Sequence, residues 1–183
     1  MPFAVRPADV EELTAGDPAV VAVENALRKA MAVASQLAAE PAGDDSSRGE
    51  WHVLGVDTIV VIDGEIHGKP ADAAHARRTL AALAGRDHLV LSGLAVAEPG
   101  ADGAAAAPRT ALAQTRVRFR QLDDATLDWY VATGEWEGRA GGYAIQERGA
   151  ALVAAIEGDY LNVVGLPVAA LLELLPALLQ EAV

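Results

Sequence analysis

The sequence predicts one α/β domain, residues 1–183, in which helices flank a mixed, twisted sheet. Two observations support this prediction. Strand-like and helix-like segments alternate along the chain, and 183 residues suit a single hydrophobic core. Apolar residues make up 52% of the chain but aromatic residues only 4%. We therefore expect an aliphatic core of Val, Leu and Ile, with Ala at the helix contacts.

The elements follow from periodicity and from the residues that start and stop them. Asp17 before Pro18 is a typical helix start, and Asp63-Gly64 is a dipeptide favoured in two-residue hairpins. Strands are expected at residues 3–6, 53–62, 65–67, 89–96, 114–120, 143–146 and 151–156. Helices are expected at residues 17–39, 70–83, 123–133 and 166–182, the last with a kink near Pro176. Polar or Gly/Ala-rich loops are expected at 40–50 and 98–108.

The charge of the chain is strongly negative, with 26 acidic and 14 basic residues and a net charge of −12. Such a surface repels duplex nucleic acid and anionic lipid, so neither is expected as a partner. No cysteine is present, which excludes thiolate metal sites and a cysteine nucleophile. The first ten residues lack the apolar run of a signal peptide, and the apolar stretch 163–179 is too interrupted to span a bilayer. These features favour a soluble cytoplasmic protein.

Asp57 is the first residue that stands out, because it lies inside an otherwise apolar strand. A carboxylate in such a place costs several kcal/mol unless it has partners. It is either a strand-end aspartate bonded to backbone N–H groups or a carboxylate aimed into a cleft as a metal ligand or general base. The hairpin at Asp63-Gly64 brings Lys69 level with Asp57 on the neighbouring strand. We therefore expect both side chains in one cleft, although a lysine alone would be read as a surface residue.

Gln146 and Tyr143 follow a glycine-rich passage, where the backbone can approach a ligand closely. A glutamine amide can read a base edge with its paired donor and acceptor, whereas an ordinary polar strand is the simpler interpretation of these residues in isolation. Glu12 and Lys29 are less specific still. The four histidines have no metal-ligand spacing, and no GxSxG, Walker or GxGxxG motif is present.

Three longer runs carry more information than any single residue. They are VLGVDTIVVIDGEIHGKP (53–70), GRAGGYAIQERGA (138–150) and IEGDYLNVVGLP (156–167). In this order they resemble the Maf family of nucleoside triphosphate pyrophosphatases, and the resemblance extends from about Pro2 to the C-terminus. It implies a fold related to inosine triphosphate pyrophosphatases, with a cleft between two lobes, and a possible homodimer. It also implies hydrolysis of a nucleoside triphosphate to monophosphate and pyrophosphate with a divalent cation, Mg²⁺ or Mn²⁺.

The resemblance assigns roles to individual residues. Asp57 matches the proton acceptor for the attacking water. The other implied roles are metal binding by Glu12 and Asp57, and substrate binding by Lys29, Thr58, Lys69 and Gln146. Asp57-Thr58 together with the run 143–146 resembles the branch that acts on dTTP and UTP.

The sequence also departs from the family pattern. Family members begin with a strand, a Ser-x-Ser-Pro-Arg-Arg loop and a helix, and Met1 here resembles the stretch just after that helix. We expect the true start upstream, since a real truncation would expose apolar surface; DNA upstream of Met1 would decide. If the phosphate loop is truly absent, a non-catalytic nucleotide binder or a cell-division-linked protein is the alternative. Arg139 stands where a lysine is common, and Glu147 where a glycine is usual.

Overall fold

The computed structural model describes residues 3–40, 51–100 and 106–179. Five strands form one sheet in the order β2-β1-β3-β4-β5, and every pair of neighbours is antiparallel. The strands are β1 (Val53–Ile62), β2 (Glu65–His67), β3 (Asp87–Ala97), β4 (Arg109–Phe119) and β5 (Val153–Glu157). The helices are α1 (Pro18–Ala39), α2 (Ala73–Leu83), α3 (Asp124–Ala132), α4 (Tyr160–Val164) and α5 (Val168–Leu174). The predicted α/β class with flanking helices is confirmed, and the strand directions in the described sheet are antiparallel rather than mixed.

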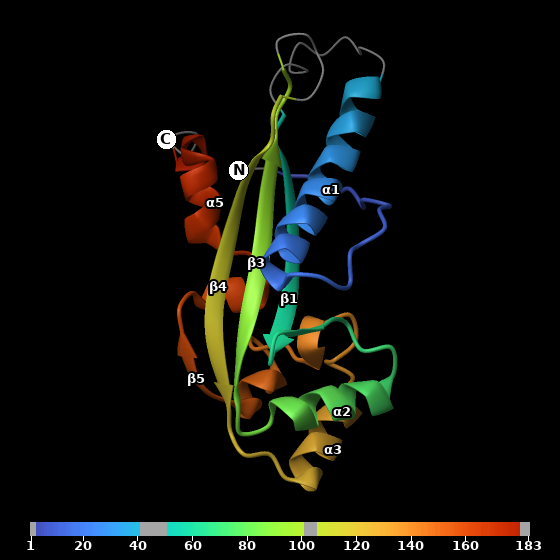
Figure 1. The fold of residues 1–183 in the computed structure, drawn as a ribbon, viewed down its shortest axis with the longest axis vertical. Helices are drawn as coiled ribbons and strands as arrows, with labels where there is room; N and C mark the ends of the chain where they lie inside the picture. The colour runs from blue at the N-terminus through green and yellow to red at the C-terminus, as the bar shows by residue number, and fades with distance from the viewer. Residues whose placement is uncertain (1–2, 41–50, 101–105, 180–183) are drawn as a thin grey trace.

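Three long strands, β1, β3 and β4, run the length of the molecule and join its two ends (Figure 1). At one end α1 packs on β1 and β3, while α5 packs on β3 and β4. At the other end α2 packs against α3, over a core cluster that includes Leu80, Phe119 and Tyr130. The sheet is therefore a shared scaffold for two groups of helices.

Helix α1 begins as the sequence predicts. Asp17 caps it by accepting hydrogen bonds from the N–H groups of Ala19 and Val20, at 3.0 and 3.1 Å. A stripe of fully buried alanines repeats every four residues along one face, at Ala22, Ala26, Ala30 and Ala34. Because 3.6 residues make one turn, these small side chains line up toward the sheet and allow a close approach.

The β1–β2 hairpin turns at Asp63 and Gly64, which have φ of 53° and 81°, as a turn of this type requires. β2 is short and pairs with β1 only from Val60 to Ile62. The part of β1 that carries Asp57 is therefore an edge of the described sheet. Side chains alternate along a strand, so Asp57 faces α1 and Thr58 faces the opposite side.

Some predicted elements are wrong in type or extent. Residues 3–6 have no regular secondary structure and pair with no described strand, and residues 143–146 form no strand but lead into a turn at 145–147. Just before this segment, the positive φ values of Gly141 and Gly142 redirect the chain. The helix predicted at 70–83 starts three residues later, because Asp72 caps it by accepting from the N–H of His75.

The C-terminal part also differs. α5 ends at Leu174 and gives way to a 3-10 turn at Pro176–Leu179, which is a break at the predicted proline. The short helix α4 was not predicted, while β4 begins five residues earlier than expected. Residues 41–50 of the loop expected at 40–50, residues 101–105 of the loop expected at 98–108, and residues 180–183 lie outside the described residues. Among the described helices, none has the length and apolar character needed to cross a membrane.

Candidate active site

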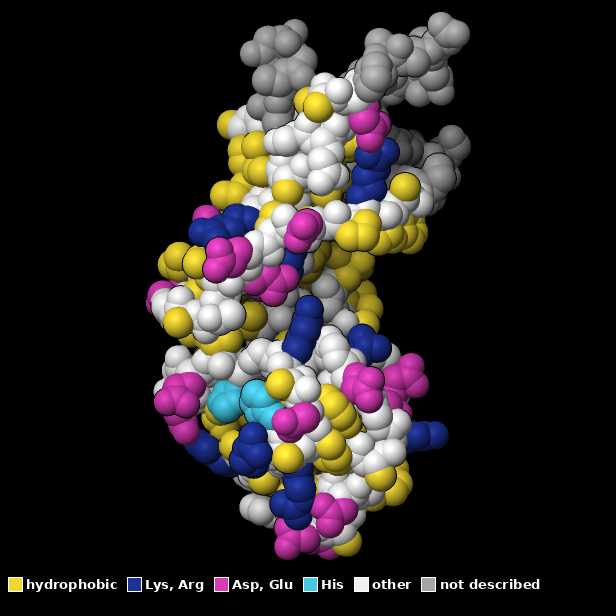
Figure 2. All heavy atoms as spheres, turned by 90° about the vertical axis from the view of Figure 1, so that its right-hand side faces the viewer, with side chains coloured by type: hydrophobic (Ala, Val, Ile, Leu, Met, Phe, Trp, Pro, Cys, Tyr) yellow, Lys and Arg dark blue, Asp and Glu magenta, His cyan; other side chains and the backbone are white. Residues whose placement is uncertain are grey.

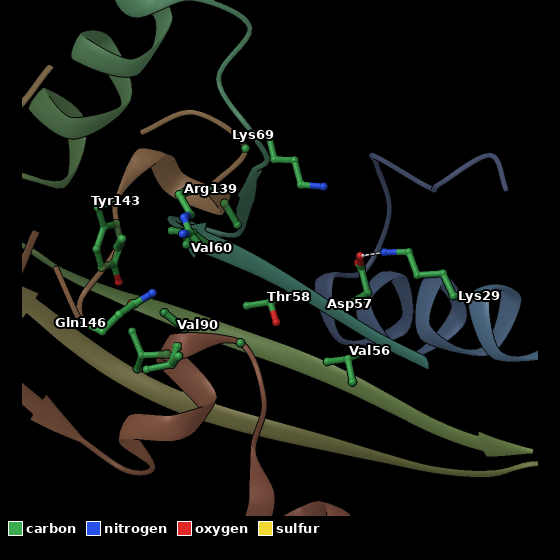
Figure 3. Close-up of a pocket in the computed structure, with 16 residues that line it drawn as sticks. Lys29, Val56, Asp57, Thr58, Val60, Lys69, Val90, Arg139, Tyr143 and Gln146 are labelled. Carbon is green, nitrogen blue, oxygen red and sulfur yellow. Dashed lines mark hydrogen bonds and ion pairs between the residues drawn. The ribbon is translucent and has the colours of Figure 1, made fainter. Parts of the chain in front are cut away.

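A cavity of about 200 Å³ opens at the free edge of β1, between the two ends of the molecule (Figure 3). From the side, the surface narrows at this level and basic side chains lie near it (Figure 2). The lining comes from α1, β1, β3, the segment after β2, the 138–146 segment and the end of α4. Its polar side chains are Lys29, Asp57, Thr58, Lys69, Arg139, Tyr143 and Gln146.

Asp57 is the buried carboxylate of this cavity, with its side chain only 8% exposed. Its Oδ1 accepts a hydrogen bond from Lys29 Nζ at 2.5 Å, and its Oδ2 accepts one from Asn25 Nδ2 at 3.0 Å. Both donors come from α1 (Figure 3 shows the bond from Lys29). The partners remove the desolvation cost that an isolated carboxylate would carry here, because each oxygen has a donor.

Lys29 joins two carboxylates. Besides Asp57, its Nζ lies 2.7 Å from Glu12 Oε1. Burial disfavours the charged ammonium, but the hydrogen bonds to Asp57 and Glu12 outweigh it and raise the pKa of Lys29. The hydrogen bond from Lys29 in turn lowers the pKa of Glu12, and the charge of Lys69 lowers it further. Lys29 and Glu12 are therefore both charged at neutral pH, and the ammonium of Lys29 lies between the carboxylates of Glu12 and Asp57.

Lys69 and Arg139 add positive charge on the side of the cavity away from α1. Lys69 lies in the exposed segment after β2, and Figure 3 shows its ammonium directed toward the space beside Asp57 and Lys29. Among the described residues, no carboxylate lies within ion-pair distance of Lys69 or Arg139. The prediction that Asp57 and Lys69 share one cavity is confirmed. The cavity thus has three basic side chains, of which Lys69 and Arg139 have no carboxylate partner among the described residues. Such a cavity suits a polyanion such as a triphosphate.

Thr58 forms part of the opposite wall and is supported by a buried polar chain. Its Oγ1 lies 2.8 Å from Ser92 Oγ on β3. Beneath it, Asn162 Nδ2 donates to Thr115 Oγ1 and to the carbonyl of Val90, both at 3.0 Å. Asn162 thereby fixes α4, whose last residues line the cavity next to Thr58. The sequence runs 53–70 and 156–167 meet here.

Gln146 lies at the far end of the cavity from Asp57, in the turn after Tyr143 (Figure 3). The segment before it is fixed by a hydrogen bond from Gly141 N–H to the carbonyl of Gly68, at 3.1 Å. A side chain at Gly141 would collide with Val60, since an added Cβ would lie 2.7 Å from its Cγ2. The turn therefore packs directly on β1 and brings Gln146 to the same cavity as Thr58.

The two carboxylates of the site are ligands that a hard divalent cation accepts. Glu12 and Asp57 present carboxylate oxygens to one point, now bridged by the Lys29 ammonium. No group of three or more potential ligands among His, Cys, Asp and Glu occurs in the described residues. Mg²⁺ is commonly held by one or two carboxylates, with substrate phosphates and water completing its shell. Two carboxylates beside free cations match that pattern better than a closed all-protein metal cage.

Sequence reasoning overlooked Asn25, which contacts Asp57 directly and is 1% exposed. A signal was available, because Asn25 interrupts the apolar face formed by Val21, Ala22 and Ala26. A polar amide on such a face requires buried partners. The five expected residues that line the cavity do come together, and Glu12 joins them through Lys29.

Comparison with known proteins bears directly on this arrangement. The sequence model of a family described as Maf-like protein matches residues 1–178. The chain belongs to the Maf family. All three runs that resemble this family contribute to the cavity: 53–70 supplies Asp57 and Lys69, 138–150 supplies Gln146, and 156–167 supplies the wall beside Thr58.

Relatives named dTTP/UTP pyrophosphatase resemble this Maf-family chain along most of its length. The protein from Symbiobacterium thermophilum is 44% identical over 169 residues, which cover 91% of this chain and 78% of that protein. The protein from Moorella thermoacetica is 43% identical over 179 residues, covering 96% and 84%. The protein from Pyrococcus furiosus is 37% identical over 175 residues, covering 93% and 82%.

Proposed function

We propose that this protein hydrolyses dTTP and UTP, and related pyrimidine nucleotides, to the monophosphate and pyrophosphate. The observation that carries the proposal is the cluster of Asp57, Lys29 and Glu12, with Lys69 in reach of the same cavity. Three Maf-family relatives that carry the name of this activity match the chain over nine tenths of its length. The charged cluster and the names of the relatives both support hydrolysis of a nucleoside triphosphate.

The reaction adds water across the phosphoanhydride between the α- and β-phosphorus. Water forms a new bond to the α-phosphorus, the bridging bond to the β-phosphate breaks, and pyrophosphate leaves. We assign Asp57 the role of accepting the proton of that water, since its two oxygens are fixed by Lys29 and Asn25. Lys29, Lys69 and Arg139 stabilise the charge on the phosphates, because such transfers depend mostly on positioning and charge neutralisation.

We further propose that Glu12 and Asp57 hold Mg²⁺ or Mn²⁺ when the substrate binds. The cation would supply neutralisation of phosphate charge, which a chain with a net charge of −12 otherwise opposes. Glu12 and Asp57 would hold the cation, and Lys29 would bind phosphate oxygens. The donor set of two carboxylates fits such a cation.

In this proposal the nucleotide base is recognised at the end of the cavity away from Asp57, where Gln146 lies. Gln146 offers a paired donor and acceptor, and Thr58 offers a hydroxyl held by Ser92. Uracil and thymine present an N3–H donor between two carbonyl acceptors, a pattern that an amide can complement. We expect Gln146 and Thr58 to favour these bases over cytosine, in which the donor and acceptor at N3 and at the C4 substituent are reversed.

Location and assembly stay predictions. Such an enzyme needs access to free nucleotides, so we propose that the protein is located in the cytoplasm. The negative net charge argues against binding nucleic acid or anionic membranes. A homodimer is a further expectation, which light scattering of the purified protein can test.

Substitution of Asp57 tests the proposed function. Asp57→Asn keeps the size of the side chain but removes the proton acceptor, so we expect kcat for dTTP to fall roughly 10²- to 10⁴-fold. Pyrophosphate release is measured with dTTP, UTP, CTP and ATP in the presence of Mg²⁺ or Mn²⁺. Asp128→Asn is the matched control, since Asp128 is 65% exposed and pairs with Arg77 on α2, in the helices at the other end of the molecule.

The proposal fails if the native chain releases pyrophosphate from none of these nucleotides. The assignment of Asp57 fails separately if Asp57→Asn keeps more than about a tenth of the native kcat. Circular dichroism and thermal unfolding of both variants test whether the fold is intact.

A further inference from the structure

Three segments of the chain meet at the side chain of Asn25, which α1 buries almost completely. Its Nδ2 donates to the carbonyl of Leu13 and to Asp57 Oδ2, each at 3.0 Å. Its Oδ1 accepts from the N–H of Leu13 at 2.7 Å. Both amide protons and the amide oxygen are therefore in use, which is full pairing for a buried asparagine.

This pairing fixes which way the amide faces. The N–H of Leu13 can only donate, so the oxygen of Asn25 must lie beside it. The amide nitrogen must then face Asp57, where it offers a proton to Oδ2. A donor at this position helps to fix the plane in which the carboxylate of Asp57 lies.

The backbone is held on both sides of Glu12. Asn25 binds the N–H and carbonyl of Leu13, and Arg28 Nη1 donates to the carbonyl of Glu11 at 3.2 Å. Glu12 lies between these two anchors and reaches Lys29 at 2.7 Å. Residues 25, 28 and 29 are spaced i, i+3 and i+4, so they share one face of α1. One helical turn thus holds the segment and both carboxylates.

We propose that Asn25 is a positioning residue that aligns Asp57 and Glu12 with each other. It binds Asp57 directly, and it ties the segment that carries Glu12 to the same helix. A segment without regular secondary structure is otherwise a poor support for a ligand, since nothing in its own backbone hydrogen bonding fixes it. The inference rests on the proposed function for its catalytic meaning, while the hydrogen bonds it invokes are independent of that function.

The first experiment separates positioning from stability. Asn25→Leu keeps the branched shape but removes all three hydrogen bonds. Val33→Ala truncates a buried side chain of α1 that packs in the cluster with Ala34 and Val53. Both variants should lose stability. We expect kcat for dTTP to fall roughly 10- to 100-fold in Asn25→Leu with KM within about threefold of native, because small misplacements of reacting groups lower the rate strongly. Val33→Ala should keep the native kcat.

A second variant distinguishes the contact with Asp57 from the contact with Leu13. Asn25→Asp can still accept from the N–H of Leu13, but it sets a carboxylate against Asp57 Oδ2 in place of a donor. We expect kcat to fall at least as far as in Asn25→Leu, although the hydrogen bond from the N–H of Leu13 is retained and only the one to its carbonyl is lost. If Asn25→Asp keeps native kcat, the contact with Asp57 has no positioning role.

A third measurement needs no activity. Amide hydrogen exchange reports on local opening, and the N–H of Leu13 is bonded to Asn25. We expect exchange at Leu13 to speed up at least tenfold in Asn25→Leu, and to stay near native in Val33→Ala. Unchanged exchange at Leu13 would overturn the anchor, and native kcat in Asn25→Leu would overturn positioning. An inactive native chain would instead defeat the proposed function, with the exchange result still deciding whether Asn25 holds the segment.

Discussion

At the scale of single residues, burial decides what His88 can do. The imidazole is 2% exposed, and its Nε2 lies 2.8 Å from the hydroxyl of Tyr143. Its ring packs edge-on against Phe119 and Tyr143, with centroids 4.9 and 5.5 Å apart. Within the described residues Nδ1 has no partner, so a second N–H would be unsatisfied. Burial lowers the pKa of His88 to about 4, and the neutral ring serves as an anchor for the segment that leads to Gln146.

This low pKa predicts a pH dependence of stability. The unfolded chain takes up a proton on His88 below about 6.5, whereas the folded chain excludes it down to about pH 4. The unfolded state therefore binds more protons in this window, and the free energy of unfolding falls as the pH is lowered through it. Between pH 7 and pH 4.5 we expect His88 to account for a loss of roughly 2–3 kcal/mol.

Urea unfolding at the two pH values measures this contribution. His88→Phe combined with Tyr143→Phe removes the titrating ring without leaving the hydroxyl unpaired. The double variant should lose less stability than the native protein between pH 7 and pH 4.5, by the amount given above. Equal losses would show that another group, rather than His88, carries the proton linkage.

At the scale of elements, the close contact between α1 and the sheet allows helix residues to reach Asp57. Gly93 on β3 is the register partner of Asp57 on β1, so both face α1. An added Cβ at Gly93 would lie 2.2 Å from the backbone carbonyl oxygen of Ala22. Gly55, two residues before Asp57, has the same relation to the carbonyl of Ala26. Glycines on the strands and alanines on the helix set the separation that Asn25 and Lys29 bridge.

Gly93→Ala should therefore displace α1. Because the obstacle is backbone, no rotamer change relieves it, and we expect a loss of roughly 1–3 kcal/mol in the free energy of unfolding. The displacement should also lower kcat, since Lys29 and Asn25 would move away from Asp57. Thermal unfolding and the dTTP assay measure the two effects.

Gly68→Ala is the control for stability. A Cβ at Gly68 meets nothing within 4 Å, and the residue has no positive φ. Its midpoint of unfolding should stay within about a degree of native. If Gly93→Ala leaves the unfolding midpoint equally unchanged, then α1 does not pack as closely as its contact with the strands indicates.

At the scale of the whole molecule, a chain with a net charge of −12 gathers basic side chains at one cavity between its two ends. Lys29, Lys69 and Arg139 come from segments far apart in the sequence, on either side of the sheet edge. A ligand that binds all of them connects the two ends. The molecule should therefore be more resistant to unfolding when a nucleotide and a cation are bound.

We expect α,β-methylene UTP, which cannot be cleaved at this bond, to raise the unfolding midpoint in the presence of Mg²⁺. At a hundred times its Kd, a ligand adds roughly 2.7 kcal/mol, which corresponds to about 5–10 °C for a chain of this size. With EDTA in place of Mg²⁺ the increase should be much smaller. An equal increase without the cation would contradict the proposed role of Glu12 and Asp57 as metal ligands.

Much of the local structure could be predicted from the sequence because its causes are local. Asp17 caps α1, the Asp63-Gly64 turn forms the hairpin, and β1 matches its predicted bounds. The predicted strands failed to form where contacts with other parts of the chain determine the local structure. Residues 3–6 have the alternation of a strand but pair with no described strand, and residues 143–146 form no strand, in a segment where Gly141 packs on Val60.

The sequence by itself determined the α/β class, the family and five polar side chains that line the cavity, since residue types and their order are enough for these. Only the tertiary structure decided how those side chains pair. That Lys29 joins Asp57 to Glu12, and that Asn25 holds both, depends on the separation between α1 and the edge of β1. This separation is set by contacts between Ala22 and Gly93, which are 71 positions apart in the sequence. No local pattern encodes such a distance.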